Sequence, residues 1–259
     1  MTDKVSVIIP TLDESKNIEN CLNCLLNQTK KPLEIIVIDN GSADKTREIV
    51  VSLKRKFGKR GIALKLFYYS RGNQTNARDF GVRKARGEIM GSLDADALAQ
   101  KDWVSKIEGY FKDAKIVGIG GKSKFRNRGK TFNLLYLWTY YFKLIFKLYC
   151  IGGNNSAFRK SAFLSVKGYN GLEKLRKTEN ILYAKDDYFL SKKLEQIGKI
   201  NFCSDLNVTL LQRVRETKKE SWKEKYSVGD TFNRIIREII YDYKINKYFN
   251  EKKKLLKSD

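Results

Sequence analysis

Short, nearly continuous apolar runs alternate with helical patterns along the first half of the chain. The runs that predict strands are residues 5–10, 34–40, 63–70, 88–96 and 115–121. Between the first four of them, apolar residues recur at helical spacing over residues 15–27, 44–57 and 73–86. Strands that alternate with helices indicate right-handed crossovers and an α/β fold with a largely parallel sheet. The unbroken runs VIIP and IIVID agree, because parallel strands are buried on both faces.

The pattern changes after residue 121. Residues 122–130 (KSKFRNRGK) place a basic residue at every second position, and residues 131–150 are apolar and rich in aromatic side chains. The segment GGNNSAFRKSAF (152–163) predicts a turn into a helix, and residues 184–198 predict a second helix that opens on paired acids. From about residue 216 onward, the pattern predicts charged helices.

Polar side chains gather where three of the predicted strands end. In chain order they are Thr11, Asp13 and Glu14, then Asp39, Ser42 and Asp44, then Asp94 and Asp96. Ligands of open α/β sheets bind beyond the carboxyl ends of the strands. We therefore expect these side chains to meet in one crevice.

Asp94 and Asp96 flank a single alanine at the end of an apolar run. Alternate residues of an extended segment point to one side, so both carboxylates suit one hard cation such as Mg²⁺ or Mn²⁺. The same residues also suit a turn or a helix cap before KDWVSKIEGYF. In IDNGSADKT, Asp39 is placed to accept hydrogen bonds from a nucleotide, although an ordinary β-turn-α connection has the same composition.

The composition limits which side chains can serve in catalysis and which partners are expected. The chain of 259 residues has no His, which excludes Ser-His-Asp and Cys-His catalysis and leaves a carboxylate, Lys, Tyr or Cys as the general base. Its net charge of +23 favours polyanionic partners, or reflects a Lys-rich proteome. Cys21 and Cys24 have C-x-x-C spacing but lie in a predicted helix, so we expect them to be packing residues with reduced thiols. Reduced thiols, no signal-peptide pattern and no long apolar stretch predict a cytoplasmic protein.

Several segments together resemble family 2 inverting glycosyltransferases of the GT-A fold. They occur in family order over about residues 4–200: VSVIIPTLDES, IIVIDNGSADKT, GNQTNARDFGVRKARGE, GSLDADA, IGGNNSAFRKSAF, GYN and KDDYFLSKKLEQIG. The resemblance implies a GT-A catalytic domain over residues 1–215, with a nucleotide-binding half (1–121) and an acceptor half (122–215). Residues 216–259 would form a C-terminal helical extension.

The resemblance also implies roles by position. It assigns the nucleotide to Pro10, Thr11, Asp13, Glu14 and Asp39, with Arg71 and Arg78 in the region that helps to form that site. It assigns Mn²⁺ or Mg²⁺ to Asp94 and Asp96, and the sugar and acceptor pocket to Gly152, Gly153 and Asn154.

Asp186 and Asp187 match the Glu-Asp pair of the family, whose second member usually serves as the catalytic base. The first position is Asp here rather than Glu, and acids at a helix start are also favoured by the helix dipole. Arg213 and Arg215 would add positive charge near the diphosphate, or are surface charge.

These features predict a metal-dependent inverting transfer from a nucleotide-diphosphate sugar to an acceptor hydroxyl or phosphate. The alternatives are a nucleotidyltransferase on a similar fold and a basic nucleic-acid-binding protein, although no specific nucleic-acid module is recognisable. Residues 122–147 carry seven basic residues and no acid beside many aromatic side chains. This segment would dock on an anionic membrane from the inner face and present a lipid-linked acceptor, or pack in the core.

Overall fold

The computed structural model describes residues 4–70, 73–126, 134, 151, 153–178, 186–211, 240–241 and 243–251. The strands are β1 (Val5–Thr11), β2 (Glu34–Asp39), β3 (Ala63–Tyr68), β4 (Ile89–Leu93), β5 (Ala97–Ala99), β6 (Ile116–Phe125), β7 (Asn155–Arg159) and β8 (Lys199–Leu210). The helices are α1 (Ile18–Leu26), α2 (Thr46–Lys59), α3 (Gln74–Lys84), α4 (Trp103–Tyr110), α6 (Lys160–Ser165), α7 (Leu172–Thr178) and α8 (Asp186–Leu194).

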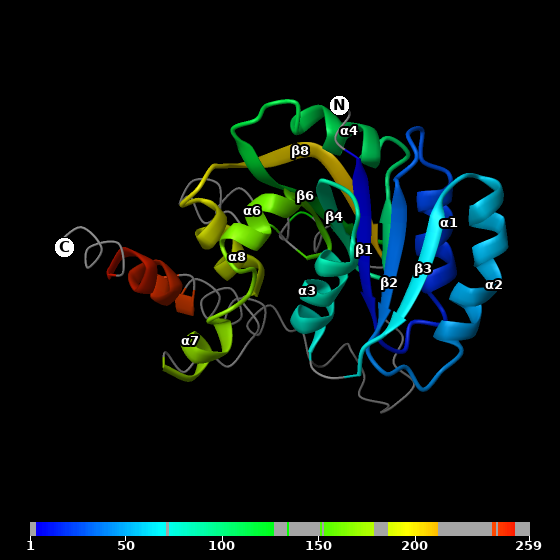
Figure 1. The fold of residues 1–259 in the computed structure, drawn as a ribbon, viewed down its shortest axis with the longest axis horizontal. Helices are drawn as coiled ribbons and strands as arrows, with labels where there is room; N and C mark the ends of the chain where they lie inside the picture. The colour runs from blue at the N-terminus through cyan, green and yellow to red at the C-terminus, as the bar shows by residue number, and fades with distance from the viewer. Residues whose placement is uncertain are drawn as a thin grey trace.

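All eight strands form one sheet in the order β3-β2-β1-β4-β7-β6-β8-β5 (Figure 1). The first four are parallel, so their carboxyl ends meet at one edge of the sheet. β7 then runs antiparallel to both β4 and β6. The predicted α/β fold is therefore confirmed, although the sheet is mixed rather than largely parallel, because β7 and β5 run antiparallel to their neighbours.

The sheet is buried on both faces, as its unbroken apolar runs predict. In β2, Ile35 and Val37 belong to one core cluster, whereas Ile36 and Ile38 belong to the other. Helices α1, α2 and α4 cover the first face, and α3, α6, α7 and α8 cover the second. This alternation follows from the two-residue period of an extended chain.

The segment predicted to be a turn into a helix has the turn at residues 153–154 and the helix α6, but the strand β7 lies between them. This strand was not predicted because the buried side chains at its start are polar. Asn155 is 1% exposed, donates to the carbonyls of Lys122 (2.7 Å) and Leu206 (2.9 Å), and accepts from the indole of Trp103 (2.8 Å). Hydrogen bonds to distant residues thus take the place of the apolar side chains that sequence patterns detect.

Two further strands, β5 and β8, were not predicted. β5 has three residues, and β8 carries polar side chains such as Asn201, Asp205 and Asn207 between its apolar ones. The predicted strand 88–96 ends at Leu93, so Asp94 and Asp96 follow it rather than belong to it. This shorter strand frees both aspartates for the loop at the sheet edge.

The two cysteines of C-x-x-C lie in α1, as expected. Cys21 is buried, and the thiol of Cys24 donates to the carbonyl of Cys21 at 3.0 Å. Cys24 also accepts from the backbone N–H of Ala99 at 3.2 Å. Both thiols are free and serve to pack α1 against β5.

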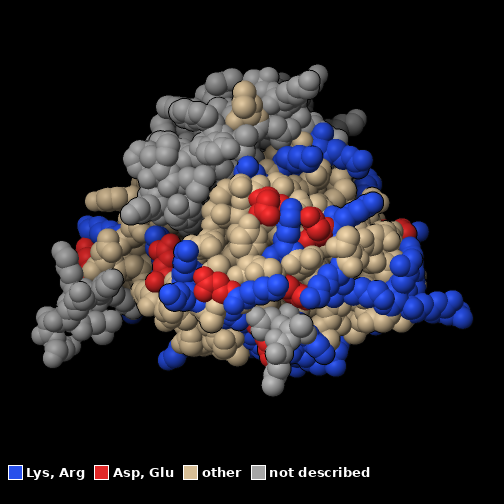
Figure 2. Space-filling model, turned by 90° about the horizontal axis from the view of Figure 1, so that it is seen from above, with Lys and Arg blue, Asp and Glu red and all other residues tan. Residues whose placement is uncertain are grey.

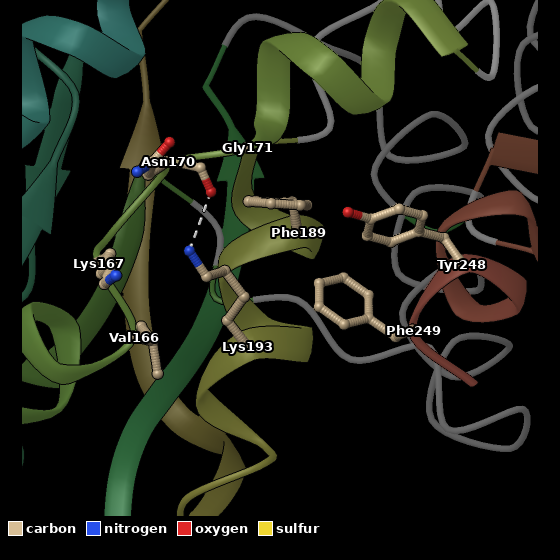
Figure 3. Close-up of a pocket in the computed structure, with 8 residues that line it drawn as sticks. All are labelled: Val166, Lys167, Asn170, Gly171, Phe189, Lys193, Tyr248 and Phe249. Atoms are coloured by element: carbon tan, nitrogen blue, oxygen red, sulfur yellow. Dashed lines mark hydrogen bonds between the residues drawn. The ribbon is translucent and has the colours of Figure 1, made fainter. Parts of the chain in front are cut away.

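A cavity of about 240 Å³ lies between α8 and helical residues 243–251, which contact each other beside it (Figure 3). Phe189 of α8 and Phe249 face each other there, with ring centroids 5.5 Å apart. The fully buried Ile245 joins the core cluster of α7 and α8. The described end of the chain therefore packs on the helix that begins with the acid pair.

Most of the basic and aromatic segment 122–147 lies outside the described residues; only residues 122–126 and Leu134 fall within them. Over the described part of the chain, no helix is both long enough and apolar enough to cross a membrane.

Candidate active site

The loops after β1 and β2 form one side of the site. Thr11 and Asp39 are register partners at the ends of the two strands. Asp39 is fully buried, accepts from the backbone N–H of Ser42 at 3.3 Å and from the Ser42 hydroxyl, and lies 3.7 Å from Arg47. Within the described chain, the buried Thr11 hydroxyl has no hydrogen-bond partner, so it keeps bonding capacity beside Asp39.

Asp13 and Glu14 tie these two loops together. Asp13 has a left-handed backbone (φ 54°), accepts from the N–H of Ala43 at 2.8 Å, and donates its own N–H to the hydroxyl of Ser42 at 3.0 Å. Glu14 is buried, accepts from the side chain of Asn17 at 2.9 Å, and donates its backbone N–H to the hydroxyl of Thr46 at 2.9 Å. The predicted nucleotide residues of β1 and β2, including Pro10 at the end of β1, are therefore neighbours at the edge of the sheet.

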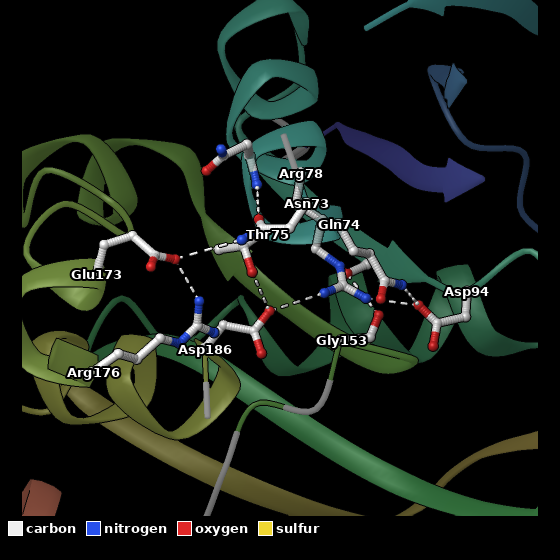
Figure 4. Close-up of polar contacts among 11 residues, drawn as sticks. Asn73, Gln74, Thr75, Arg78, Asp94, Gly153, Glu173, Arg176 and Asp186 are labelled. Atoms are coloured by element: carbon white, nitrogen blue, oxygen red, sulfur yellow. Dashed lines mark hydrogen bonds and ion pairs between the residues drawn. The ribbon is translucent and has the colours of Figure 1, made fainter. Parts of the chain in front are cut away.

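Asp94 and Asp96 emerge from β4 at the same edge. The side chain of Asp94 is 28% exposed and Asp96 is partly exposed. Asp94 Oδ1 accepts from Arg78 Nη2 at 2.6 Å and from Gln74 Nε2 at 3.0 Å (Figure 4). The backbone carbonyl of Asp96 accepts from Leu211 at 2.7 Å, which fixes the turn that carries both carboxylates.

The acid pair at the start of α8 reaches the site from the other half of the chain. Asp186 is 8% exposed, and its Oδ2 accepts from the hydroxyl of Thr75 at 2.8 Å. The same oxygen lies 3.5 Å from Arg78 Nη1. Both partners come from α3, so this helix contacts both Asp94 and Asp186 (Figure 4).

Burial disfavours the charge of Asp187. Burial, and after it the charge of Asp186, raise its pKa to about 7, while Arg78 and the backbone of Gly153 oppose the shift. Among the described residues, Asp187 Oδ1 is buried without a hydrogen-bond partner. A carboxylate with a pKa near neutrality and an unused oxygen can take up a proton, which is what a general base requires.

Gly153 and Asn154 precede β7 and lie between these groups. The carbonyl of Gly153 accepts from the hydroxyl of Ser92 at 2.8 Å, and Asn154 Oδ1 accepts from the hydroxyl of Ser123 at 3.4 Å. The remaining predicted site residues lie outside the described residues: Arg71, Gly152, Arg213 and Arg215.

Asp94 and Asp96 fit a divalent cation by the chemistry of their donors. Their carboxylates are hard oxygen ligands, and a cation bound by two carboxylates completes its shell with phosphate oxygens and water. No group of three or more His, Cys, Asp or Glu residues that could hold a metal occurs in the described part of the chain. Any metal here would therefore need ligands from the substrate.

Sequence reasoning missed Gln74 and Thr75. They precede Arg78 by four and three residues on α3, which places all three side chains on one helix face. That spacing was the available signal once Arg78 had been assigned to the site.

A model of glycosyl transferase family 2 matches residues 6–166. The chain belongs to glycosyl transferase family 2. Glycosyltransferase AglE of Haloferax volcanii is 32% identical over 123 residues, which are 47% of this chain and 40% of AglE. The uncharacterized glycosyltransferase EpsJ of Bacillus subtilis is 30% identical over 122 residues, 46% of this chain and 34% of EpsJ. The matched region thus spans less than half the length of either relative.

A longer match runs to a dolichyl N-acetyl-alpha-D-glucosaminyl phosphate 3-beta-D-2,3-diacetamido-2,3-dideoxy-beta-D-glucuronosyltransferase of Methanococcus voltae. It is 25% identical over 248 residues, 90% of this chain and 74% of that protein.

Solved structures show that this family 2 chain has the GT-A fold. The mannosyltransferase PcManGT of Pyrobaculum calidifontis, solved with GDP-Man and Mn²⁺, superposes with a TM-score of 0.62 at 21% identity over 90% of this chain and 64% of that one. TarS of S. aureus, residues 1–349 with UDP-GlcNAc, superposes with a TM-score of 0.57 at 19% identity over 92% of this chain and 66% of that one.

Proposed function

We propose that the protein is an inverting glycosyltransferase that moves a sugar from a nucleotide-diphosphate sugar to an acceptor hydroxyl or phosphate. One observation carries this proposal: Asp187, with its raised pKa, directly follows Asp186, and Arg78 pairs with both Asp186 and Asp94. A proton acceptor and a candidate phosphate-metal ligand are therefore close enough to act on one substrate. Family membership favours glycosyl transfer over the nucleotidyltransferase alternative.

The nucleotide would bind at the ends of β1 and β2. Asp39 and Thr11 would receive the ribose and the base, on loops that Asp13 and Glu14 hold in place. Asp94 and Asp96 would hold Mn²⁺ or Mg²⁺ against the diphosphate, where a divalent ion supplies Lewis-acid stabilisation of the leaving group. PcManGT, the structural neighbour with GDP-Man and Mn²⁺, supports this choice of donor and metal.

The transfer is a single displacement. Asp187 takes the proton of the acceptor O–H as that oxygen forms a bond to the anomeric carbon of the sugar. The bond between the anomeric carbon and the diphosphate oxygen breaks, and the nucleoside diphosphate leaves with the electron pair. Attack from the side opposite the leaving group inverts the anomeric centre. Asp186 touches Thr75 and Arg78 instead, so its role would be to orient the start of α8.

For the acceptor we propose a lipid-linked sugar or phosphate at a membrane surface. The Methanococcus voltae relative acts on a dolichyl-linked acceptor by its name, and it aligns with 90% of this chain. The basic and aromatic segment 122–147 would provide the membrane contact. Co-sedimentation with anionic liposomes tests this part: binding should weaken with salt and when Lys122, Lys124, Arg126 and Arg128 become Gln. A protein that stays in the supernatant at low salt would make a soluble acceptor the better proposal.

The nucleic-acid alternative needs a continuous basic surface. On the face seen in Figure 2, acidic side chains are interspersed among the basic ones, so the basic side chains there do not form one continuous positive patch. Retention on DNA that modest salt abolishes, without any turnover of nucleotide sugars, would support that alternative.

The experiment that tests the proposed function is a thermal-shift panel of UDP- and GDP-sugars with and without Mn²⁺. A bound donor stabilises the folded state by mass action, so the correct donor should raise Tm in a concentration-dependent and metal-dependent way. Release of nucleoside diphosphate in the presence of acceptor then measures transfer. No shift with any nucleotide sugar would contradict the proposal.

A further inference from the structure

A single buried guanidinium joins the two sides of the site. Arg78 is 5% exposed; its Nη2 lies 2.6 Å from Asp94 Oδ1 and its Nη1 lies 3.5 Å from Asp186 Oδ2 (Figure 4). Burial opposes its charge, but the carboxylates of Asp94, Asp187 and Asp186 hold its pKa above the usual value. The guanidinium therefore stays charged, and its two ends are directed at different carboxylates.

Gly153 makes room for this guanidinium. A Cβ at that position would lie 2.3 Å from Arg78 Cζ, 2.3 Å from Nη2 and 2.5 Å from Nη1. The three heavy atoms nearest to this Cβ all belong to Arg78. An alanine at this position would therefore force the guanidinium of Arg78 to shift.

We infer that Arg78 is a positioning residue that couples the donor side of the site, through Asp94, to the acid pair of α8, through Asp186. This inference rests on the proposed function. It adds a route by which donor binding at Asp94 changes the surroundings of Asp186, the neighbour of the proposed base Asp187. A ligand that moves Asp94 toward a metal-bound diphosphate would weaken the pairing of Asp94 with Arg78. The guanidinium could then pair more strongly with Asp186. Groups that share one charged partner in this way have non-additive effects.

Nucleotide binding provides the first test. The probes are UDP and GDP with Mn²⁺, titrated by calorimetry into the whole protein. Asp186 has no described contact with the loops after β1, β2 and β4, and it is linked to Asp94 through Arg78 and through Thr75 and Gln74 of the same helix. Asp186→Asn should change the affinity through Arg78, and the Arg78→Lys background removes this route while leaving Thr75 and Gln74 in place. We expect a change of about threefold or more in the wild-type background, and less than about twofold in the Arg78→Lys background. Lys keeps the charge, but its single ammonium does not reproduce the two-ended guanidinium.

Asp79→Asn is the matched control. It removes a carboxylate from the next residue of α3, but that carboxylate pairs with Arg83 on the surface. The nucleotide affinity of this variant should equal that of the wild type. An equal effect of Asp186→Asn in both backgrounds, or no effect in either, would overturn the inference.

Gly153→Ala provides a second test that needs no nucleotide. Its methyl group should displace the guanidinium and lower Tm, and the loss should be smaller in an Arg78→Ala background, where the obstructing atoms are gone. Equal losses in the two backgrounds would show that Arg78 does not explain the glycine. If the wild type binds neither nucleotide, the proposed function fails and this stability comparison still decides the role of Gly153.

Discussion

The two sides of the candidate site are built in different ways. On the donor side, the contacts that hold the carboxylates include short-range ones: Ser42 lies 3 residues from Asp39 in the chain, and Thr46 lies 2 residues from Asp44. On the acceptor side, Asp186 is held by Thr75 and Arg78, which lie 111 and 108 residues away. The donor loops are thus shaped partly by their own sequences, whereas the acid pair depends on how α8 docks against α3.

The same contrast appears in the protonation of the two sides. Burial opposes the charge of Asp44, but hydrogen bonds from Thr46 and Ser15 outweigh burial and lower its pKa to about 2. Burial and Asp186 instead raise the pKa of Asp187. Donor-side Asp44 is therefore an anion at neutral pH that joins two loops, whereas Asp187 on the acceptor side can exchange a proton near neutral pH.

The largest expected effect comes from Asp187→Asn. An amide of the same shape cannot accept the acceptor's proton, so kcat should fall by roughly 10²–10⁴-fold. Donor affinity should change little, because the substitution acts on the chemical step. Steady-state transfer and nucleotide titration measure the two quantities. If Asp187→Asn remains active and Asp186→Asn does not, the roles of the two acids are exchanged.

A smaller effect, on nucleotide affinity rather than on kcat, is expected from Asp39→Asn. Hydrogen bonds to charged groups contribute about 1.5–3 kcal/mol, so nucleotide affinity should fall by roughly tenfold to a hundredfold. The kcat value at saturating donor should stay near that of the wild type. Asp102→Asn, which removes a surface carboxylate paired with Lys106, is the control and should change neither value. A fall in kcat alone would break the proposed division between donor and acceptor sides.

The pH profile sharpens the comparison further. Because the pKa of Asp187 is about 7, kcat/KM should rise with pH up to that region, and Asp186→Asn should move this limb to lower pH by removing a neighbouring negative charge. Stability should change in the opposite direction. Above about pH 4 the unfolded chain has released this proton and the folded chain retains it, so stability falls as pH rises toward 7.

Asp187→Asn should remove this fall in the free energy of unfolding between about pH 4 and 7, measured by chemical denaturation at a series of pH values. An unchanged pH dependence would show that another group causes it.

The smallest expected effect is on stability, through Asp44 and the loops that it joins on the donor side. Asp44 accepts from the backbone N–H groups of Ser15 and Thr46, so it satisfies the first N–H of α2 from the residue before the N-cap and joins the two loops. Asp44→Ala should lower the free energy of unfolding by about 1 kcal/mol at neutral pH. Since the pKa of Asp44 is lowered, its contribution is present above about pH 4 and lost as pH falls toward 2, so wild type and variant should converge in acid. A constant difference across this pH range would contradict the role of its charge.

Much of the first half of the molecule could be predicted from its sequence. Its apolar runs and helical periods are local patterns, and β1 to β4 and α1 to α3 lie within a few residues of the predicted ranges. The acids that follow these strands lie along one edge of the sheet, because parallel strands bring their carboxyl ends there. Asp186 and Asp187 also lie at the start of a helix, as their segment predicts.

The second half required the tertiary structure. β7 begins with Asn155, whose buried side chain bonds to distant residues, so this strand was not predicted. Because β7 runs antiparallel beside β4, it places Gly153 against Arg78 of α3. By itself the sequence determined which residue types stand at the strand ends and at the start of α8. Only the tertiary structure decided that one arginine joins them, because a guanidinium finds partners more than a hundred residues away only after both halves have packed.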